Sequence, residues 1–136
     1  MYRVTTEAID PRSIQRAVQR DEHGAVVTFL GVVRHHSEGR RVRYLEYEAY
    51  PQMAEKKLRE IGEEIKARWG IEHVAMVHRI GHLDIGEIVL VIAIASAHRR
   101  EAFEAAQYAV DRIKEVVPIW KKEVWEGGEA WVGANH

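Results

Sequence analysis

Apolar side chains recur every three or four residues in two long segments, and this period predicts two long amphipathic helices. The first segment opens with Pro51 and stops before Gly70, residue types that favour the start and the end of a helix. Its apolar positions are Ala54, Leu58, Ile61, Ile65 and Trp69. The second segment covers residues 100–117, and its apolar positions are Phe103, Ala106, Val110, Ile113 and Val117. Each helix is therefore expected to bury one stripe of side chains.

Six further segments are rich in Val, Ile, Thr or aromatic residues, or alternate apolar with polar positions, as strands do. They cover residues 24–33, 41–47, 71–80, 88–97, 120–125 and 130–132. Residues 88–97 are almost wholly apolar, which predicts a central strand buried on both faces. A polar loop is expected at 35–40 and a connecting turn at 81–86. A short helix over 12–20 is expected to begin at Asp10-Pro11, because Asp caps helices and Pro fits the first turn.

The predicted order places single helices between groups of strands joined by short turns, which favours an α+β fold with mixed sheets. No repeat, low-complexity segment or linker interrupts this order, so a single domain is expected over residues 1–136. The first residues lack the apolar core of a signal peptide, and no run of about 18 apolar residues occurs. These features favour a cytoplasmic protein.

The composition narrows the possible chemistry. The chain has no cysteine, which excludes disulfides, thiolate metal sites and a cysteine nucleophile on this chain. The formal net charge of -1 argues against a general nucleic-acid-binding protein, which normally carries a strong basic excess. Neither of the common glycine-rich phosphate-binding motifs occurs. The eight histidines are not spaced like metal ligands, so no metal and no cofactor are predicted.

Three basic residues lie where predicted strands end. Arg34 follows a strand, and arginine offers a rigid fork of donors suited to phosphate or carboxylate. His98 and Arg99 follow the most apolar strand and precede the second long helix, where backbone N–H groups attract anions. Positive charge at this end does not favour the helix itself, and such departures from local rules often mark function. The alternative is a solvated side chain for Arg34, and for Arg99 a side chain that is solvated or paired with Glu101 or Glu104.

Three lysines follow in the last third of the chain. Lys114 lies in the last turn of its predicted helix, where a lysine stabilises the helix dipole without any further role. Lys121 and Lys122 lie side by side on a predicted strand, so their side chains point to opposite faces. One of the two can therefore face a site while the other is solvated. Together with the preceding residues, these lysines predict a local anion site.

Several motifs occur in a distinctive order along the chain. They are residues 24–29 with Gly31-x-Val33-Arg34, the stretch from Leu45-Glu46 to Tyr50-Pro51-x-Met53, His78-Arg79-Ile80-Gly81-x-Leu83, Ser96-Ala97-His98-Arg99, Ala102-Phe103-Glu104-Ala105 and Pro118-Ile119-Trp120-Lys121. In combination, over about residues 21–131, they resemble the large, catalytic subunit of molybdopterin synthase. The resemblance implies an α/β hammerhead-type fold with an additional antiparallel sheet.

The same resemblance implies partners and a reaction. Members of this family form a homodimer at the centre of a heterotetramer, with a small ubiquitin-like sulfur-carrier subunit at each end. They convert cyclic pyranopterin monophosphate to molybdopterin by installing two dithiolene sulfurs. Each sulfur arrives as the C-terminal thiocarboxylate of the carrier. A chain without cysteine agrees with this chemistry, because the partner brings the sulfur.

The resemblance also assigns roles to individual residues. Lys114 and Lys121 are expected to be catalytic, orienting the thiocarboxylate and exchanging protons during sulfur attack. Arg34, His98 and Arg99 are expected to hold the phosphate and the pterin edge by charge-assisted hydrogen bonds. The complete set of expected substrate-binding residues is Val32, Val33, Arg34, His98, Arg99, Lys114, Lys121, Lys122 and Glu123.

Two points stay open at this stage. Some members continue beyond this C-terminus or carry a basic residue near the position of Asn135, so a contribution of the tail to the pocket is uncertain in this chain. A non-catalytic phosphate- or nucleotide-binding regulatory module is the main alternative function, because it would use the same basic cluster. An RNA-binding α+β domain is a further alternative, although the near-neutral charge argues against it.

Overall fold

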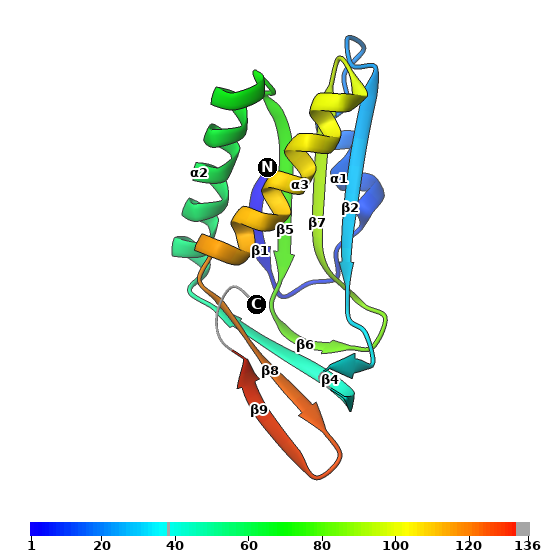
Figure 1. Cartoon of the computed structure of the whole chain (residues 1–136), viewed down its shortest axis with the longest axis vertical. Coiled ribbons are helices and arrows are strands. Elements are labelled where there is room, and N and C mark those ends of the chain that lie inside the picture. Colours follow the sequence, from blue (N-terminus) through cyan, green and yellow to red (C-terminus); the bar gives the residue numbers. More distant parts are fainter. Residues whose placement is uncertain (38, 133–136) are drawn as a thin grey trace.

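A four-stranded mixed sheet forms the centre of the molecule (Figure 1). The computed structural model describes residues 1–37 and 39–132, so Asn135 lies outside the described residues. The strand order is β1 (Tyr2–Thr5), β5 (His73–Arg79), β7 (Ile88–Ser96) and β2 (Ala25–Val32). β1 is parallel to β5, and the other two pairings are antiparallel. The predicted mixed sheet and the central position of residues 88–97 are confirmed, since β7 is buried from Val89 to Ser96.

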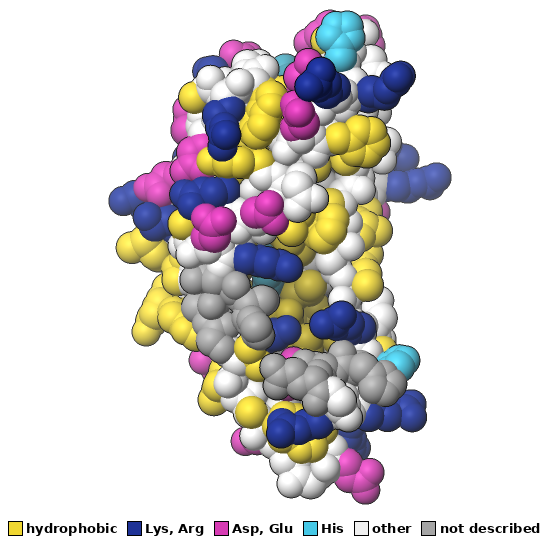
Figure 2. Space-filling model, in the orientation of Figure 1, with side chains coloured by type: hydrophobic (Ala, Val, Ile, Leu, Met, Phe, Trp, Pro, Cys, Tyr) yellow, Lys and Arg dark blue, Asp and Glu magenta, His cyan; other side chains and the backbone are white. Residues whose placement is uncertain are grey.

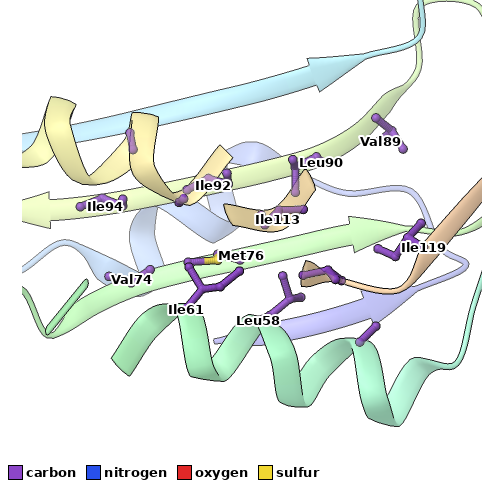
Figure 3. Close-up of a cluster of buried hydrophobic side chains, with 14 of the residues drawn as sticks. Leu58, Ile61, Val74, Met76, Val89, Leu90, Ile92, Ile94, Ile113 and Ile119 are labelled. Atoms are coloured by element: carbon purple, nitrogen blue, oxygen red, sulfur yellow. The ribbon is translucent and has the colours of Figure 1, made fainter. Parts of the chain in front are cut away.

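Helices cover both faces of this sheet. α2 (Pro51–Trp69) and α3 (Arg99–Val116) lie on one face, and α1 (Pro11–Val18) lies on the other. Successive strand residues point to opposite faces, so Met76 packs with α2 and α3 while Val77 packs with α1. Figure 3 shows Leu58 and Ile61 of α2 close to Met76 of β5. β7 is therefore apolar from Ile88 to Ala95 because both of its faces are covered.

The predicted end of α2 at Gly70 is confirmed. Gly70 has φ 70°, the left-handed conformation that glycine adopts most readily, and its N–H donates to the carbonyl of Lys66. Within the described residues, no helix is both long and apolar enough to cross a membrane.

The buried stripe of α3 differs from the predicted one. Phe103 was expected in the core, but its side chain is 61% exposed. The fully or nearly fully buried positions are Ala102, Ala105, Ala106, Ala109 and Ile113. Small alanine side chains let the helix lie close to β7 and β2, so the sheet selects the alanine face and turns the bulkier phenylalanine outward.

A second, antiparallel sheet packs against one end of the first. It contains β3 (His36–Ser37), β4 (Arg40–Ala49), β8 (Ile119–Trp125) and β9 (Gly128–Val132), and β6 (Gly81–Asp84) pairs with β4 as well. The sequence predicted a turn at 81–86 and a loop at 35–40, and both are wrong in part, because β6 and β3 are short strands there. Neither has the length or alternation of a strand in isolation, and each forms by pairing with β4.

A polar contact fixes α3 against α2. Arg112 of α3 donates through Nε to Glu64 Oε1 at 3.0 Å and through Nη2 to Oε2 at 3.2 Å. The hydroxyl of Tyr108 donates to the same carboxylate at 2.5 Å. Bidentate pairing of this kind constrains orientation as well as distance. The contact therefore sets the direction in which the last turn of α3 leads into the second sheet.

Leu58→Ala is expected to reduce the free energy of unfolding by about 2–5 kcal/mol, because Leu58 is fully buried between α2 and the sheet. Arg59→Ala, at the exposed neighbouring position, is the matched control and is expected to change it by less than about 0.5 kcal/mol. Urea unfolding of the three proteins measures both values. Equal stability of the two variants would show that α2 does not pack as described.

Candidate active site

A cavity of about 220 Å³ lies where the first sheet, α3 and the second sheet meet. This volume is several times the share of about 30 Å³ that one water molecule occupies in the liquid, so the cavity has room for part of a ligand. Its walls are mostly apolar and include Phe29 and Val32 of β2, Leu90 of β7 and Ile113 of α3. Figure 2 shows lysine and arginine side chains spread over this face of the molecule, several of them near the junction of the sheets.

The two predicted catalytic lysines both line this cavity. Lys114 reaches it from the last turn of α3, directly after Ile113. Pro118 cannot continue the helix, and the chain turns there into β8. Ile119 and Lys121 are two residues apart on β8 and therefore share one face of the strand, which is the face toward the cavity. The end of a helix and the start of a strand thus place two ammonium groups at one apolar cavity.

A smaller adjoining cavity of about 100 Å³ contains most of the remaining predicted residues. Its lining includes Val32, Tyr47 and Lys121, which also line the first cavity. It further includes Val33, Arg34 and Glu123, which the sequence analysis expected to bind substrate. The structure therefore brings together six of the expected positions from three separate elements. They are Val32, Val33, Arg34, Lys114, Lys121 and Glu123.

The charges around the two cavities are unevenly paired. Lys121 Nζ lies 3.7 Å from Oε2 of Glu123, a carboxylate that is 8% exposed. In contrast, within the described part of the chain neither Arg34 nor Lys114 forms an ion pair or a hydrogen bond through its side chain. Two cations without a protein carboxylate therefore face the cavities, and an anionic ligand is the chemistry that they are suited to bind.

Comparisons with known proteins identify the family of the chain. The family model described as MoaE protein matches residues 4–116. The chain belongs to the MoaE family. It is 53% identical over 126 residues to the molybdopterin synthase catalytic subunit of Halalkalibacterium halodurans, covering 90% of this chain and 81% of the relative. It is 49% identical over 132 residues to the protein of the same name from Bacillus subtilis, covering 97% of this chain and 84% of the relative.

The fold of this MoaE-family chain also matches a solved structure. The crystal structure of molybdopterin synthase from Staphylococcus aureus superposes with a TM-score of 0.94 at 47% sequence identity, covering 97% of this chain and 96% of the other. This match confirms the expected hammerhead-type α+β fold with its additional antiparallel sheet, and it confirms the resemblance from which that fold was inferred.

Three of the expected residues do not join the others within one MoaE-family chain. Lys122 points to the opposite face of β8, where Nζ lies 3.0 Å from Glu46 Oε2 and 3.5 Å from Glu129 Oε2. Alternation along a strand gives the reason, because Lys121 already takes the cavity face. The predicted opposite orientation of Lys121 and Lys122 is therefore confirmed, and a contact of Lys122 with the substrate stays a prediction.

His98 and Arg99 lie at the other end of the molecule from the lysines. His98 caps α3 and Arg99 begins it, whereas Lys114 lies in its last turn. Arg99 and Lys114 are thus separated by about 22 Å along the axis, at 1.5 Å per residue. His98 and Arg99 line a separate depression together with Gly24 and Ala97. The expected convergence of all basic residues on one anion is therefore wrong within one chain, since the two groups lie at opposite ends of α3.

Sequence reasoning missed a histidine and a tyrosine at the lysine cavity. His78 of β5 and Tyr47 of β4 both line it, and their ring centroids are 5.3 Å apart at an interplanar angle of 63°. Burial raises the pKa of Tyr47 to about 12, with a smaller contribution from Glu123, so its phenol keeps its proton at neutral pH. The alternation of β5 places His78 on the same face as Met76, a signal that the sequence already carried.

Stability should depend on pH through His78. Burial lowers the pKa of His78 to about 4, from an ordinary value near 6.5. Between these values the unfolded chain binds more protons than the folded one, so the free energy of unfolding falls as the pH falls. We expect the free energy of unfolding to fall by about 3 kcal/mol between pH 7 and pH 4 in the unaltered protein, and we expect this fall to be absent in His78→Gln. Urea unfolding at both pH values measures it, and identical pH dependence in the variant would contradict the burial of this ring.

A second group of polar side chains lies elsewhere, near the start of β5. Glu22, His23 and His73 each place one ligand atom within 4.8 Å of the others. The backbone N–H of Arg20 donates to His23 Nδ1 at 3.0 Å, so the uncharged ring carries its hydrogen on Nε2. A metal-bound histidine instead needs one bare nitrogen and donates from the other. This donor set therefore does not fit a metal ion.

Proposed function

We propose that this chain is the catalytic subunit of a molybdopterin synthase and acts at the cavity lined by Lys114 and Lys121. Its substrate is cyclic pyranopterin monophosphate, and its sulfur donor is the C-terminal thiocarboxylate of a small ubiquitin-like carrier subunit. The observation that carries the proposal is the pair of lysines at an apolar cavity, beside the unpaired Arg34, in a chain of the MoaE family. The chain acts as one cytoplasmic domain.

The charged residues at the two cavities have separate roles in the proposed reaction. Arg34 and Lys114 have no carboxylate partner among the described residues, so they can bind the phosphate and the thiocarboxylate without first breaking an ion pair. The sulfur forms a bond to a ring carbon as a carbon–oxygen bond of that carbon breaks and the oxygen leaves with a proton. Water then adds to the acyl carbon and the acyl–sulfur bond breaks, so the sulfur stays on the pterin as a thiol and the carrier is left with a carboxylate. Lys121 exchanges the protons of these steps, and the buried Glu123 beside it holds its ammonium group in place.

A second copy of the chain supplies the residues that one chain keeps apart. β2 is an edge strand of the first sheet, paired with β7 along one side. Phe29 is 36% exposed, Leu30 42% and Val32 54%, an apolar row beside unpaired backbone groups. Such an edge is a ready template for another strand. In a symmetric dimer of this kind the same edge meets itself, so the two β2 strands run antiparallel.

Antiparallel pairing brings the two basic groups together across the dimer. The start of β2 lies next to the end of β7, since the N–H of Gly24 donates to Ser96 O at 3.1 Å. His98 and Arg99 follow directly after that point. The end of β2 leads instead to Arg34 and the lysine cavity. Pairing two such strands in opposite directions places His98 and Arg99 of one copy beside Arg34 and Lys114 of the other.

Single-turnover conversion of cyclic pyranopterin monophosphate tests the proposed function. The chain is mixed with carrier that ends in a thiocarboxylate, and molybdopterin formation is followed directly. Product that requires both proteins supports the proposal. A folded chain that binds the carrier or the pterin but yields no molybdopterin would overturn it and favour the non-catalytic phosphate-binding module.

A further inference from the structure

His78 is a buried polar side chain at the lysine cavity to which neither the fold nor the proposed proton transfers assign a task. Its side chain is one of the few buried polar ones, with 6% exposure, and it lines the cavity together with Lys114 and Lys121. It enters from β5, whereas the two lysines enter from α3 and β8. The ring therefore approaches the cavity from the side of the first sheet, away from the charged groups.

The hydrogen bond on one side of the ring determines which nitrogen is free. Nδ1 lies 2.7 Å from the carbonyl oxygen of Arg79, which can only accept, so Nδ1 carries the hydrogen. The low pKa of His78 means that the ring is uncharged at neutral pH, and Nε2 is then a bare acceptor. Within the described part of the chain, no donor reaches Nε2. The protein thus holds an acceptor ready in a cavity whose other polar groups are mainly donors.

We infer that His78 is a substrate-binding residue whose Nε2 accepts a hydrogen bond from an N–H or O–H group of the pterin bound in the cavity. This inference rests on the proposed function and adds to it the recognition of the uncharged end of the substrate. Two ammonium groups bind anions at any orientation, because a lysine is a point charge. A bare acceptor that faces the cavity among apolar walls selects instead for a donor at one position, since a ligand that lacks this donor excludes water from Nε2 and leaves it unpaired.

The neighbouring phenol extends the same pattern. Tyr47 lies against the His78 ring and lines both cavities, and its hydroxyl makes no hydrogen bond to any described residue. Because the phenol stays protonated, it offers a donor close to the acceptor nitrogen. A donor and an acceptor side by side match the edge of a pterin ring, where N–H groups and carbonyl or imine acceptors alternate. The lysines then bind the charged groups, while His78 and Tyr47 fix the orientation of the pterin ring in the cavity.

Two replacements separate the two nitrogens of His78. In His78→Gln the side-chain oxygen takes roughly the place of Nε2, and in His78→Asn the amide nitrogen takes that of Nδ1 and keeps the bond to Arg79 O. We expect His78→Gln to keep kcat/KM within about threefold of the unaltered protein, and His78→Asn to lose about tenfold or more, chiefly through KM. His82→Gln, at an exposed histidine of β6 paired with Asp84, is the matched control.

The outcomes distinguish this inference from the proposed function. If the unaltered protein forms no molybdopterin, the proposed function fails and His78 is not at issue. If it does, and His78→Asn is as active as His78→Gln or more so, the acceptor role is wrong and His78 serves the fold through Nδ1. Equal large losses in both variants, with unchanged thermal stability, also overturn the role.

A measurement on the unaltered protein covers the case in which the variants do not fold. With ¹⁵N-labelled histidine and sequential assignment of the His78 ring, its Nε2 resonance is expected at the position of a bare nitrogen. Addition of the pterin without carrier is expected to move this resonance upfield, toward that of a hydrogen-bonded nitrogen. A resonance that stays in place at saturating pterin would overturn the inference.

Discussion

Lys121→Ala is expected to lower the single-turnover rate of molybdopterin formation by a factor of about 10²–10⁴, the range that a positioned proton donor or acceptor contributes. Lys121 lines both cavities at the junction of the sheets and is the one lysine that they share. Lys114→Ala is expected to fall in the same range, because Lys114 lines the larger cavity together with Lys121. The measurement is the rate at saturating carrier and saturating pterin.

Lys121→Arg tests the positive charge at this position separately from its proposed role in proton exchange. Arginine keeps the positive charge beside Glu123 but does not give up its proton near neutral pH. We therefore expect binding of the carrier tail to survive in this variant while the rate stays low. Lys66→Ala, an exposed position near the far end of α2, is the control for loss of a lysine as such. A rate for Lys121→Ala within threefold of the unaltered protein would remove Lys121 from the reaction.

Mixing two inactive variants is expected to restore activity. In a dimer of Lys121→Ala with Arg99→Ala, one shared site carries both replacements and the other carries neither. Random assortment makes half of the dimers mixed, so about a quarter of all sites are intact. We expect about a quarter of the original activity when the two chains are produced together, against nearly none for either alone.

The control for this experiment pairs Lys121→Ala with Lys114→Ala. Both lysines line the same cavity of one chain, so every site in the mixed dimer keeps one defect and no activity returns. Recovery in the first mixture together with none in the second places Arg99 across the dimer. An Arg99→Ala chain that is active by itself would remove Arg99 from the site, and failure of the first mixture would show that the two edges do not meet as proposed.

The helices and central strands could be predicted from the sequence because their signals are local. The period of α2 and the apolar run of β7 each follow from residues within one segment. β6 could not be found in this way, since four residues with two exposed side chains become a strand only by pairing with β4. Phe103 misled for a related reason, because the size of a side chain does not tell which face of a helix can approach a sheet most closely.

The sequence indicated which residues belong to the site better than it indicated where they lie in space. Arg34, Lys114 and Lys121 come together because an edge strand, a helix end and a strand start meet at one junction. The sequence placed His98 and Arg99 at the start of α3 correctly, and the predicted length of that helix already separates Arg99 from Lys114 by about 22 Å, a distance that the expected convergence left out of account. His78 was overlooked as a ligand-binding group because its proposed role depends on the hydrogen bond from Nδ1 to the carbonyl oxygen of Arg79. The spacing of residues in the sequence does not show this hydrogen bond.

The cavity lies where the two sheets meet, so a ligand that binds there stabilises the folded chain. Its lining comes from β2, β5 and β7 of the first sheet, from α3, and from β4 and β8 of the second. A molecule seated there touches both sheets at once and is lost when they separate. The folded chain is therefore stabilised by RT ln(1 + [L]/Kd), about 2.7 kcal/mol at a hundredfold excess over Kd. Pterin bound at the proposed site is therefore expected to make the chain more resistant to proteolysis.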